Sequence, residues 1–189
     1  VKNARIIPDT NIGYVRIVQF NEPTAEKLGE SLEELKQKGI EALILDLRNN
    51  PGGLLESAVD VSSYFLEEGK LVVSTEGRRP SQKREFHARD GTRFGDMPIA
   101  VLINAGSASA AEIVAGCLQD WGRAVLVGVK SFGKGSVQNV IELPDGSALR
   151  LTTAMYFTPS RQQIHEHGIE PDIEVALTEE EIRKLMERQ

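Results

Sequence analysis

The sequence is poor in cysteine and histidine, with one cysteine and three histidines among 189 residues. A single cysteine excludes a disulfide within the chain and a metal site built from cysteines. Cys117 lies on the apolar face of a predicted helix, which indicates a buried thiol. We therefore expect neither a cysteine nucleophile nor cysteine-based metal binding.

The histidines do not stand where a catalytic imidazole is expected. His87 lies in a basic, polar segment, and His165 and His167 lie in a polar loop, so none of them follows a buried strand that would hold the ring. His165 and His167, with Glu166 and Glu170, could suggest a metal site, but this spacing is a weak signal without further histidine or cysteine. The preferred interpretation is solvated loop residues, with no metal site and no Ser–His–Asp triad.

Long apolar runs and an excess of positive charge are also missing. No apolar stretch approaches the ~20 residues of a membrane-spanning helix, and no charged-then-apolar leader is visible. The net charge of −6 argues against a general nucleic-acid role. Basic residues gather in segment 78–93, which could attract an acidic tail. With a turn at Asp90-Gly91, the preferred interpretation of this segment is a solvated β-hairpin.

Ser109 stands where a predicted strand turns into a predicted helix. Residues 98–104 form an apolar run typical of a core strand, and apolar residues then recur with helical spacing up to Trp121. A helix N-terminus offers unpaired N–H groups and a partial positive charge, which suit the oxyanion formed when a hydroxyl attacks a carbonyl. The alternative is a capping box between Ser109 and Glu112, which is the commoner use of this pattern.

Lys134 lies in a second candidate segment, flanked by two glycines that would let it approach a neighbour closely. If the segment is extended, Lys134, Ser136 and Gln138 point to one face. A lysine that acts as a general base must be uncharged, and desolvation lowers a lysine pKa from its usual ~10.4. A neutral Gln138 could orient the amine without restoring its charge. The alternatives are a surface lysine in a glycine-rich turn and a phosphate loop, whose full motif is absent.

The rest of the chain predicts a single α/β domain. The order of predicted elements is strand, helix, strand: a strand at 13–20, a helix ending at Gly39 and an apolar strand at 42–47. This order implies a right-handed crossover and one layer of parallel or mixed sheet covered by helices. Further predicted elements are a helix near 55–66, a strand at 70–74, a hairpin of 137–143 and 148–157, and a short C-terminal helix whose capping box pairs Thr178 with Glu181.

The loop after strand 42–47 is a third candidate segment. Residues 48–53 form a turn by composition, and its two glycines permit positive φ and an exposed N–H. An ordinary strand-to-helix loop is the alternative, but beside Ser109 the N–H of Gly53 becomes a candidate oxyanion donor. Asp46 and Arg48 share a strand face and predict a structural ion pair.

Four motifs together resemble the catalytic domain of carboxyl-terminal processing proteases, also called tail-specific proteases. They occur in that family's order and span most of the chain. The matching segments are Leu45–Gly53, Gly106–Glu112, Phe132–Gln138 and Gly168–Asp172.

The resemblance implies a serine endopeptidase that cleaves protein substrates near their C-terminus through a Ser–Lys dyad. Ser109 would be the nucleophile, Lys134 the base and Gln138 its support. The backbone N–H groups of Gly53 and Ala110 would form the oxyanion hole. The implied fold is the Clp-protease/crotonase-like core, and no cofactor is implied. A non-catalytic binding or regulatory homologue of the same fold stays open as the alternative.

The resemblance also implies partners and a compartment. The expected partners are C-terminal tails of proteins or peptides, together with a peptide-binding PDZ domain. No PDZ module is found in residues 1–189, and its junction is expected near residues 1–10. Family members act outside the cytoplasm, in the bacterial periplasm, on the outer membrane-associated face or in the plastid lumen. Ala111 and Arg161 depart from the family's usual serine and glycine.

Overall fold

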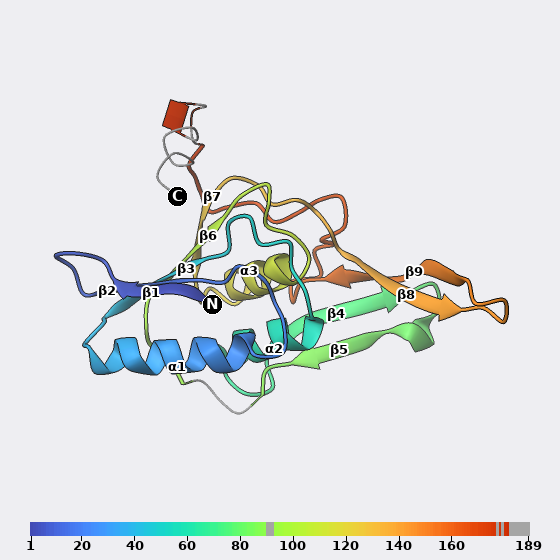
Figure 1. Ribbon diagram of the computed structural model, residues 1–189, viewed down its shortest axis with the longest axis horizontal. Helices are drawn as coiled ribbons and strands as arrows, with labels where there is room; N and C mark the ends of the chain where they lie inside the picture. The colour runs from blue at the N-terminus through green and yellow to red at the C-terminus, as the bar shows by residue number, and fades with distance from the viewer. Residues whose placement is uncertain (90–92, 177, 179, 182–189) are drawn as a thin grey trace.

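Two β-sheets and three α-helices build the described part of the chain (Figure 1). The computed structural model describes residues 1–89, 93–176, 178, 180 and 181. None of the helices within these residues is long and apolar enough to cross a membrane. The helices are α1 (Thr24–Gln37), α2 (Leu55–Ser63) and α3 (Ala110–Asp120).

The first sheet is mixed, as predicted. Its order is β1-β2-β3-β6-β7-β10, in which β1 pairs antiparallel to β2 and the other neighbours pair in parallel. Helix α1 connects the parallel neighbours β2 and β3, so the expected strand–helix–strand unit is confirmed. The strands are β1 (Lys2–Ile6), β2 (Ile12–Arg16), β3 (Ala42–Asp46), β6 (Ile99–Ile103), β7 (Val125–Gly128) and β10 (Ile173–Glu174).

A second, antiparallel sheet was not expected from the sequence. Its order is β5-β4-β9-β8, and it forms because β4 pairs with β9, a strand more than seventy residues later in the chain. The β8–β9 hairpin projects away from the body of the protein (Figure 1). The strands are β4 (Leu71–Gly77), β5 (Arg84–His87), β8 (Ser136–Glu142) and β9 (Ala148–Phe157).

The basic segment contributes β5 to a hairpin with β4. Strands β4 and β5 pair across residues 78–83, where η1 (Pro80–Gln82) makes the connection. Asp90 and Gly91, the predicted turn, lie outside the described residues. The basic side chains of this segment are exposed, which agrees with a solvated hairpin.

Helix α3 is the buried centre of the fold. All of its residues from Ala110 to Leu118 are buried, and it packs against α2, β4 and β7. Cys117 is fully buried, which confirms the predicted buried thiol, and burial raises its pKa far above the ordinary value. Because α3 is enclosed in this way, the residue that precedes it is held by the body of the protein.

The C-terminal capping box is confirmed. The N–H and the hydroxyl of Thr178 each lie 2.8 Å from a carboxylate oxygen of Glu181. The apolar stripe predicted for the helix falls on residues 182–189, which lie outside the described residues.

Candidate active site

Ser109 occupies a sharp turn between β6 and α3. Its backbone has φ 56° and ψ −115°, a conformation that residues other than glycine rarely adopt. Such strain costs about 1–3 kcal/mol and persists where the surrounding structure imposes it, commonly at functional sites. A strained strand-to-helix turn is also the geometry that presents a nucleophilic serine hydroxyl to substrate. The Ser109 side chain is half-buried and therefore accessible.

The predicted capping box forms only in part. The Glu112 carboxylate accepts a hydrogen bond from the Ser109 N–H at 2.8 Å, but the Ser109 hydroxyl makes no capping hydrogen bond in return. The hydroxyl is thus left available for another role. Capping accounts for the glutamate, and it does not account for the serine side chain.

Glu112 connects the serine turn to the lysine segment. Its side chain is fully buried, and one oxygen, Oε2, accepts the N–H of Ser109 and the N–H of Lys134, each at 2.8 Å. The other oxygen, Oε1, accepts the Ser131 hydroxyl at 2.5 Å and the Gly133 N–H at 2.7 Å. Because they share one acceptor atom, the backbone nitrogens of Ser109 and Lys134 cannot lie farther apart than twice 2.8 Å.

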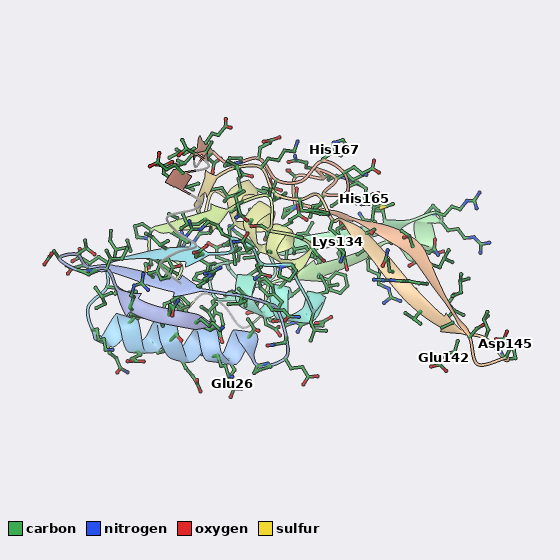
Figure 2. The ribbon with its side chains drawn as sticks, turned by 45° about the horizontal axis from the view of Figure 1, so that its top comes forward. Glu26, Lys134, Glu142, Asp145, His165 and His167 are labelled. Carbon is green, nitrogen blue, oxygen red and sulfur yellow. The ribbon has the colours of Figure 1, made fainter. Side chains whose placement is uncertain are left out.

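The glycines beside Lys134 allow close packing, as predicted, and the neighbour is the loop at 164–168. A Cβ atom at Gly135 would lie 2.3 Å from the backbone nitrogen of His165, and Gly133 has φ +89°. Figure 2 shows Lys134 near the start of the β8–β9 hairpin, beside His165, whereas Glu142 lies toward the far tip. The Lys134 side chain is exposed, so the described residues do not supply the burial expected of a base.

The condition under which Lys134, Ser136 and Gln138 would share one face, an extended segment throughout, is not met. Strand β8 begins only at Ser136, and its pairing with β9 shifts register between Val137 and Gln138. Such a bulge interrupts the alternation of side chains. Gln138 is exposed and pairs with Thr152. No hydrogen bond joins the side chains of Ser109, Lys134 and Gln138 within the described residues.

The loop that carries Gly53 lies against the serine turn. Ala108 donates its N–H to the Asn50 carbonyl at 2.8 Å, and a Cβ atom at Gly52 would lie 2.7 Å from the Cβ of Ser109. At Gly53, where φ is +143°, a Cβ atom would lie 1.9 Å from the Phe20 carbonyl oxygen, so only glycine fits. Within the described residues the N–H groups of Gly53 and Ala110 donate no hydrogen bond.

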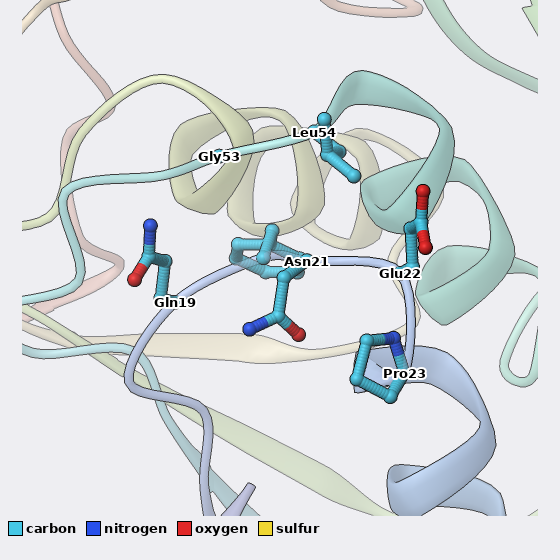
Figure 3. A pocket seen from close by; sticks show the side chains of 7 residues that line it. Gln19, Asn21, Glu22, Pro23, Gly53 and Leu54 are labelled. Atoms are coloured by element: carbon cyan, nitrogen blue, oxygen red, sulfur yellow. The ribbon is translucent and has the colours of Figure 1, made fainter.

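Gly53 also lines a pocket of about 460 Å³ (Figure 3). Its walls come from the segment that links β2 to α1 and from the start of the segment that leads into α2. The lining residues are Gln19, Phe20, Asn21, Glu22, Pro23, Gly53 and Leu54.

The ion pair predicted between Asp46 and Arg48 is confirmed. The Arg48 side chain donates to both carboxylate oxygens of Asp46, at 2.9 and 2.8 Å, and the Tyr14 hydroxyl donates to Asp46 at 2.6 Å. Burial raises the pKa of the Asp46 carboxyl, but the hydrogen bonds from Arg48 and Tyr14 outweigh burial and hold the pKa below its usual range. This pair stabilises the end of β3, directly before the Gly53 loop.

The sequence matches the model of peptidase family S41 over residues 11–175, which is most of the chain. The chain belongs to peptidase family S41. The match confirms the resemblance that the four motifs carried.

Two curated S41 relatives are carboxyl-terminal processing proteases by name. The chain is 48% identical over 179 residues to the carboxy-terminal-processing protease of Bartonella bacilliformis, covering 93% of this chain and 41% of that protein. It is 44% identical over 165 residues to the carboxyl-terminal-processing protease of Synechocystis sp., covering 87% and 38%. The chain therefore spans less than half the length of these relatives.

Solved structures confirm the fold class. The photosystem II D1 C-terminal processing protease superposes with a TM-score of 0.81 and 35% identity, over 93% of this chain and 46% of that one. Mature CPAF, at 18% identity and a TM-score of 0.76, shares the fold. An S41 chain with this mixed sheet and buried central helix fits the predicted Clp-protease/crotonase-like core.

Sequence reasoning missed the second role of Glu112 in this S41 domain. The sequence pattern gave it only a capping role, whereas the structure also bonds it to Ser131, Gly133 and Lys134. The available signal was an acidic residue inside a helix whose other residues are almost all apolar or small. The pocket beside Gly53 had no sequence signal, because its walls come from two separate segments, residues 19–23 and residues 53–54.

Proposed function

We propose that the chain is the catalytic part of a serine endopeptidase that cleaves protein substrates near their C-terminus, with Ser109 and Lys134 as its dyad. One observation carries the proposal: the buried Glu112 carboxylate holds the backbone N–H groups of Ser109 and Lys134 on a single oxygen atom. The strained Ser109 turn and the names of the S41 relatives support it.

In the proposed reaction, the Ser109 Oγ attacks the substrate carbonyl carbon while the Lys134 amine takes the hydroxyl proton. The N–H groups of Gly53 and Ala110 bind the resulting oxyanion. The C–N bond then breaks, and Lys134 returns the proton to the leaving amine. Water hydrolyses the acyl-serine ester in the second half, when Lys134 accepts a proton from water and passes it to Ser109. Gln138 would orient the amine.

The proposal requires that the exposed Lys134 side chain becomes covered during the reaction. A lysine base needs water removed from around it, so an extended, apolar-ended substrate tail or another part of the protein must cover it. A PDZ domain in the parent protein is the proposed cover, and the proposed location is outside the cytoplasm or in the plastid lumen. One S41 relative, from Arabidopsis thaliana, is named a chloroplastic processing peptidase.

The test is cleavage of an unfolded protein with an apolar C-terminal tail by wild type, Ser109→Ala and Lys134→Ala, with mass spectrometry of the products. We expect wild type to cut and both variants to lose at least about a hundredfold in rate, as general-base removal typically does. Normal cleavage by Lys134→Ala would exclude the dyad and bring His165, which lies beside this segment, into consideration as the base.

The exposed Lys134 also favours a second candidate, a non-catalytic binding homologue. A fluorophosphonate probe separates the two, because it labels only an activated serine. Labelling of wild type, with none in Ser109→Ala, supports the peptidase. Absence of labelling in a well-folded chain that still binds an apolar tail peptide supports the binding protein.

A further inference from the structure

The segment Gly168–Asp172 is one of the four motifs in the sequence, yet none of its residues has a role in the proposed reaction. Two hydrogen bonds join this segment to Ser131. The Ser131 N–H donates to the Ile169 carbonyl at 3.1 Å, and the Ile169 N–H donates to the Ser131 hydroxyl oxygen at 2.7 Å. Both residues are buried, so the motif contacts the lysine segment through one enclosed serine.

The Ser131 hydroxyl also bonds to Glu112. A backbone N–H can only donate, so the hydroxyl oxygen accepts from Ile169 and its hydrogen points to Oε1 of Glu112, 2.5 Å away. Oε2 of the same carboxylate accepts the N–H groups of Ser109 and Lys134. Because the two oxygens belong to one rigid group, the hydroxyl that orients Oε1 also orients Oε2.

The loop before the motif packs closely on the lysine segment. The Glu166 N–H donates to the Gly133 carbonyl at 2.9 Å. A Cβ atom at Gly168, where φ is +67°, would lie 2.8 Å from the Ser131 carbonyl oxygen and 3.1 Å from its hydroxyl oxygen. Glycine at this position allows the two backbones to approach. Residues 131–134 are therefore held both by Glu112 and by residues 166–169.

The far end of the motif is bonded to the last turn of α3. The Asp172 carboxylate accepts the Leu126 N–H at 2.7 Å and the Gln119 side-chain amide at 2.8 Å. The same amide donates to the Glu170 carbonyl at 3.1 Å. Gln119 lies near the end of α3, whereas Glu112 lies in its first turn. The motif thus connects to both ends of the helix and keeps Ser131 in place beside it.

We propose that Ser131 is a positioning residue of the active site, held by the Gly168–Asp172 motif and acting through Glu112. Its hydroxyl orients the carboxylate to which the backbones of Ser109 and Lys134 are bonded. This inference rests on the proposed peptidase function. Because Ser131 is buried and does not touch substrate, loss of its hydroxyl lowers kcat and leaves KM almost unchanged.

Ser131→Ala removes the hydroxyl, and Ser63→Ala is the matched control. Ser63 is also buried, and its hydroxyl likewise donates to a carbonyl, that of Val59 at 2.8 Å, and accepts a backbone N–H, that of Arg89 at 2.9 Å. Both variants should lower Tm by about 3–8 °C. Only Ser131→Ala should also reduce kcat, by about tenfold, with KM within about twofold of wild type, because small displacements of reacting groups are costly.

Two further variants separate the hydrogen bonds from packing. Ser131→Cys keeps the size of the side chain but bonds weakly, so it should resemble Ser131→Ala in kcat. Gly168→Ala brings a Cβ atom against Ser131 and should also reduce kcat. Its control is Gly122→Ala, at φ +61° with nothing within 4 Å of the added atom, which should lower Tm only.

Amide hydrogen exchange, followed by NMR, gives a readout that does not depend on activity. The N–H groups of Ser109, Gly133 and Lys134 all donate to Glu112. Relative to wild type, they should exchange at least about tenfold faster in Ser131→Ala, because local opening becomes easier. Their exchange in Ser63→Ala should increase far less.

Unchanged kcat in an active Ser131→Ala variant would overturn the inference. Equal losses of kcat in Ser131→Ala and Ser63→Ala, or wild-type kcat in Ser131→Cys, would also overturn it. Faster exchange at the three N–H groups in a chain that does not cleave would refute the peptidase proposal and keep the positioning role. Cleavage that Ser109→Ala abolishes and that Ser131→Ala leaves unchanged would do the reverse.

Discussion

Replacing Glu112 by glutamine should damage both the stability of the protein and the proposed active site. The carboxylate accepts four hydrogen bonds in a fully buried position, two on each oxygen. Glutamine keeps one acceptor oxygen and puts an NH₂ group in place of the other. If the NH₂ replaces Oε2, the N–H groups of Ser109 and Lys134 both lose their acceptor. If it replaces Oε1, the Ser131 hydroxyl can turn to accept, and the Gly133 N–H is left unpaired.

One or two buried N–H groups therefore lose their partner, each costing about 1–3 kcal/mol. We expect Glu112→Gln to lower the free energy of unfolding by about 2–4 kcal/mol, which lowers Tm by about 5–15 °C in a domain of this size. The turn and the lysine segment should also shift relative to one another. A displacement of about 1 Å can reduce kcat a hundredfold, while KM should change little because the Glu112 side chain is fully buried and does not reach a bound substrate.

The assay is thermal unfolding together with cleavage of the apolar-tailed substrate well below Tm. Glu30→Gln, the same chemical change at an exposed position of α1, serves as the control and should resemble wild type. If Glu112→Gln unfolds within about 2 °C of wild type and cuts at the same rate, the shared carboxylate does not hold the site together and this reasoning is refuted.

Three further predictions follow from the same geometry. Ser109→Gly should be about 1 kcal/mol more stable than Ser109→Ala in urea unfolding, because glycine relieves the strain of φ 56°; equal stabilities would mean that no strain is stored there. Gly53→Ala should reduce kcat strongly, because the added Cβ would lie 1.9 Å from the Phe20 carbonyl oxygen. Gly39→Ala is the control: its φ is also positive, at +84°, but its Cβ would meet open space, so this variant should only lower Tm slightly. Asp46→Asn should destabilise the protein at pH 7. Because the pKa of Asp46 is lowered by folding, its contribution is present above the unfolded value of ~3.9 and is lost as pH falls through the folded value. The difference between wild type and Asp46→Asn in urea unfolding should therefore shrink below about pH 4, and a constant difference would exclude this linkage.

The β4–β5 hairpin and the segment from Lys134 to Gln138 show where local sequence patterns were insufficient to predict the structure. The turn predicted at Asp90-Gly91 lies outside the described residues, and the hairpin that the structure does describe pairs β4 with β5 across 78–83, where the Arg79 N–H bonds to the Gln82 side chain. Alternation of side chains favoured one face for Lys134 and Gln138, but a bulge intervenes. The bulge lies in the pairing of β8 with its hairpin partner β9, and cross-strand context of this kind commonly outweighs a local preference in sheets.

The sequence by itself determined the elements whose signals are local. The period of apolar residues determined α1, α3 and the parallel strands, because burying one face of each helix and both faces of β3 requires that spacing. The glycines at 53, 133 and 135 indicated positions where the backbone needs a positive φ or a close approach to a neighbour. The four motifs were sufficient to identify the S41 family.

Only the tertiary structure decided how these pieces meet. The second sheet, the pocket beside Gly53 and three of the four hydrogen bonds of Glu112 each join segments that lie far apart in the chain. Hydrogen bonding and burial depend on distance in space, and a buried carboxylate must find its donors wherever the fold brings them. For that reason the sequence predicted Ser109 and Lys134 as separate candidates, and the folded chain brought their backbones to one oxygen atom.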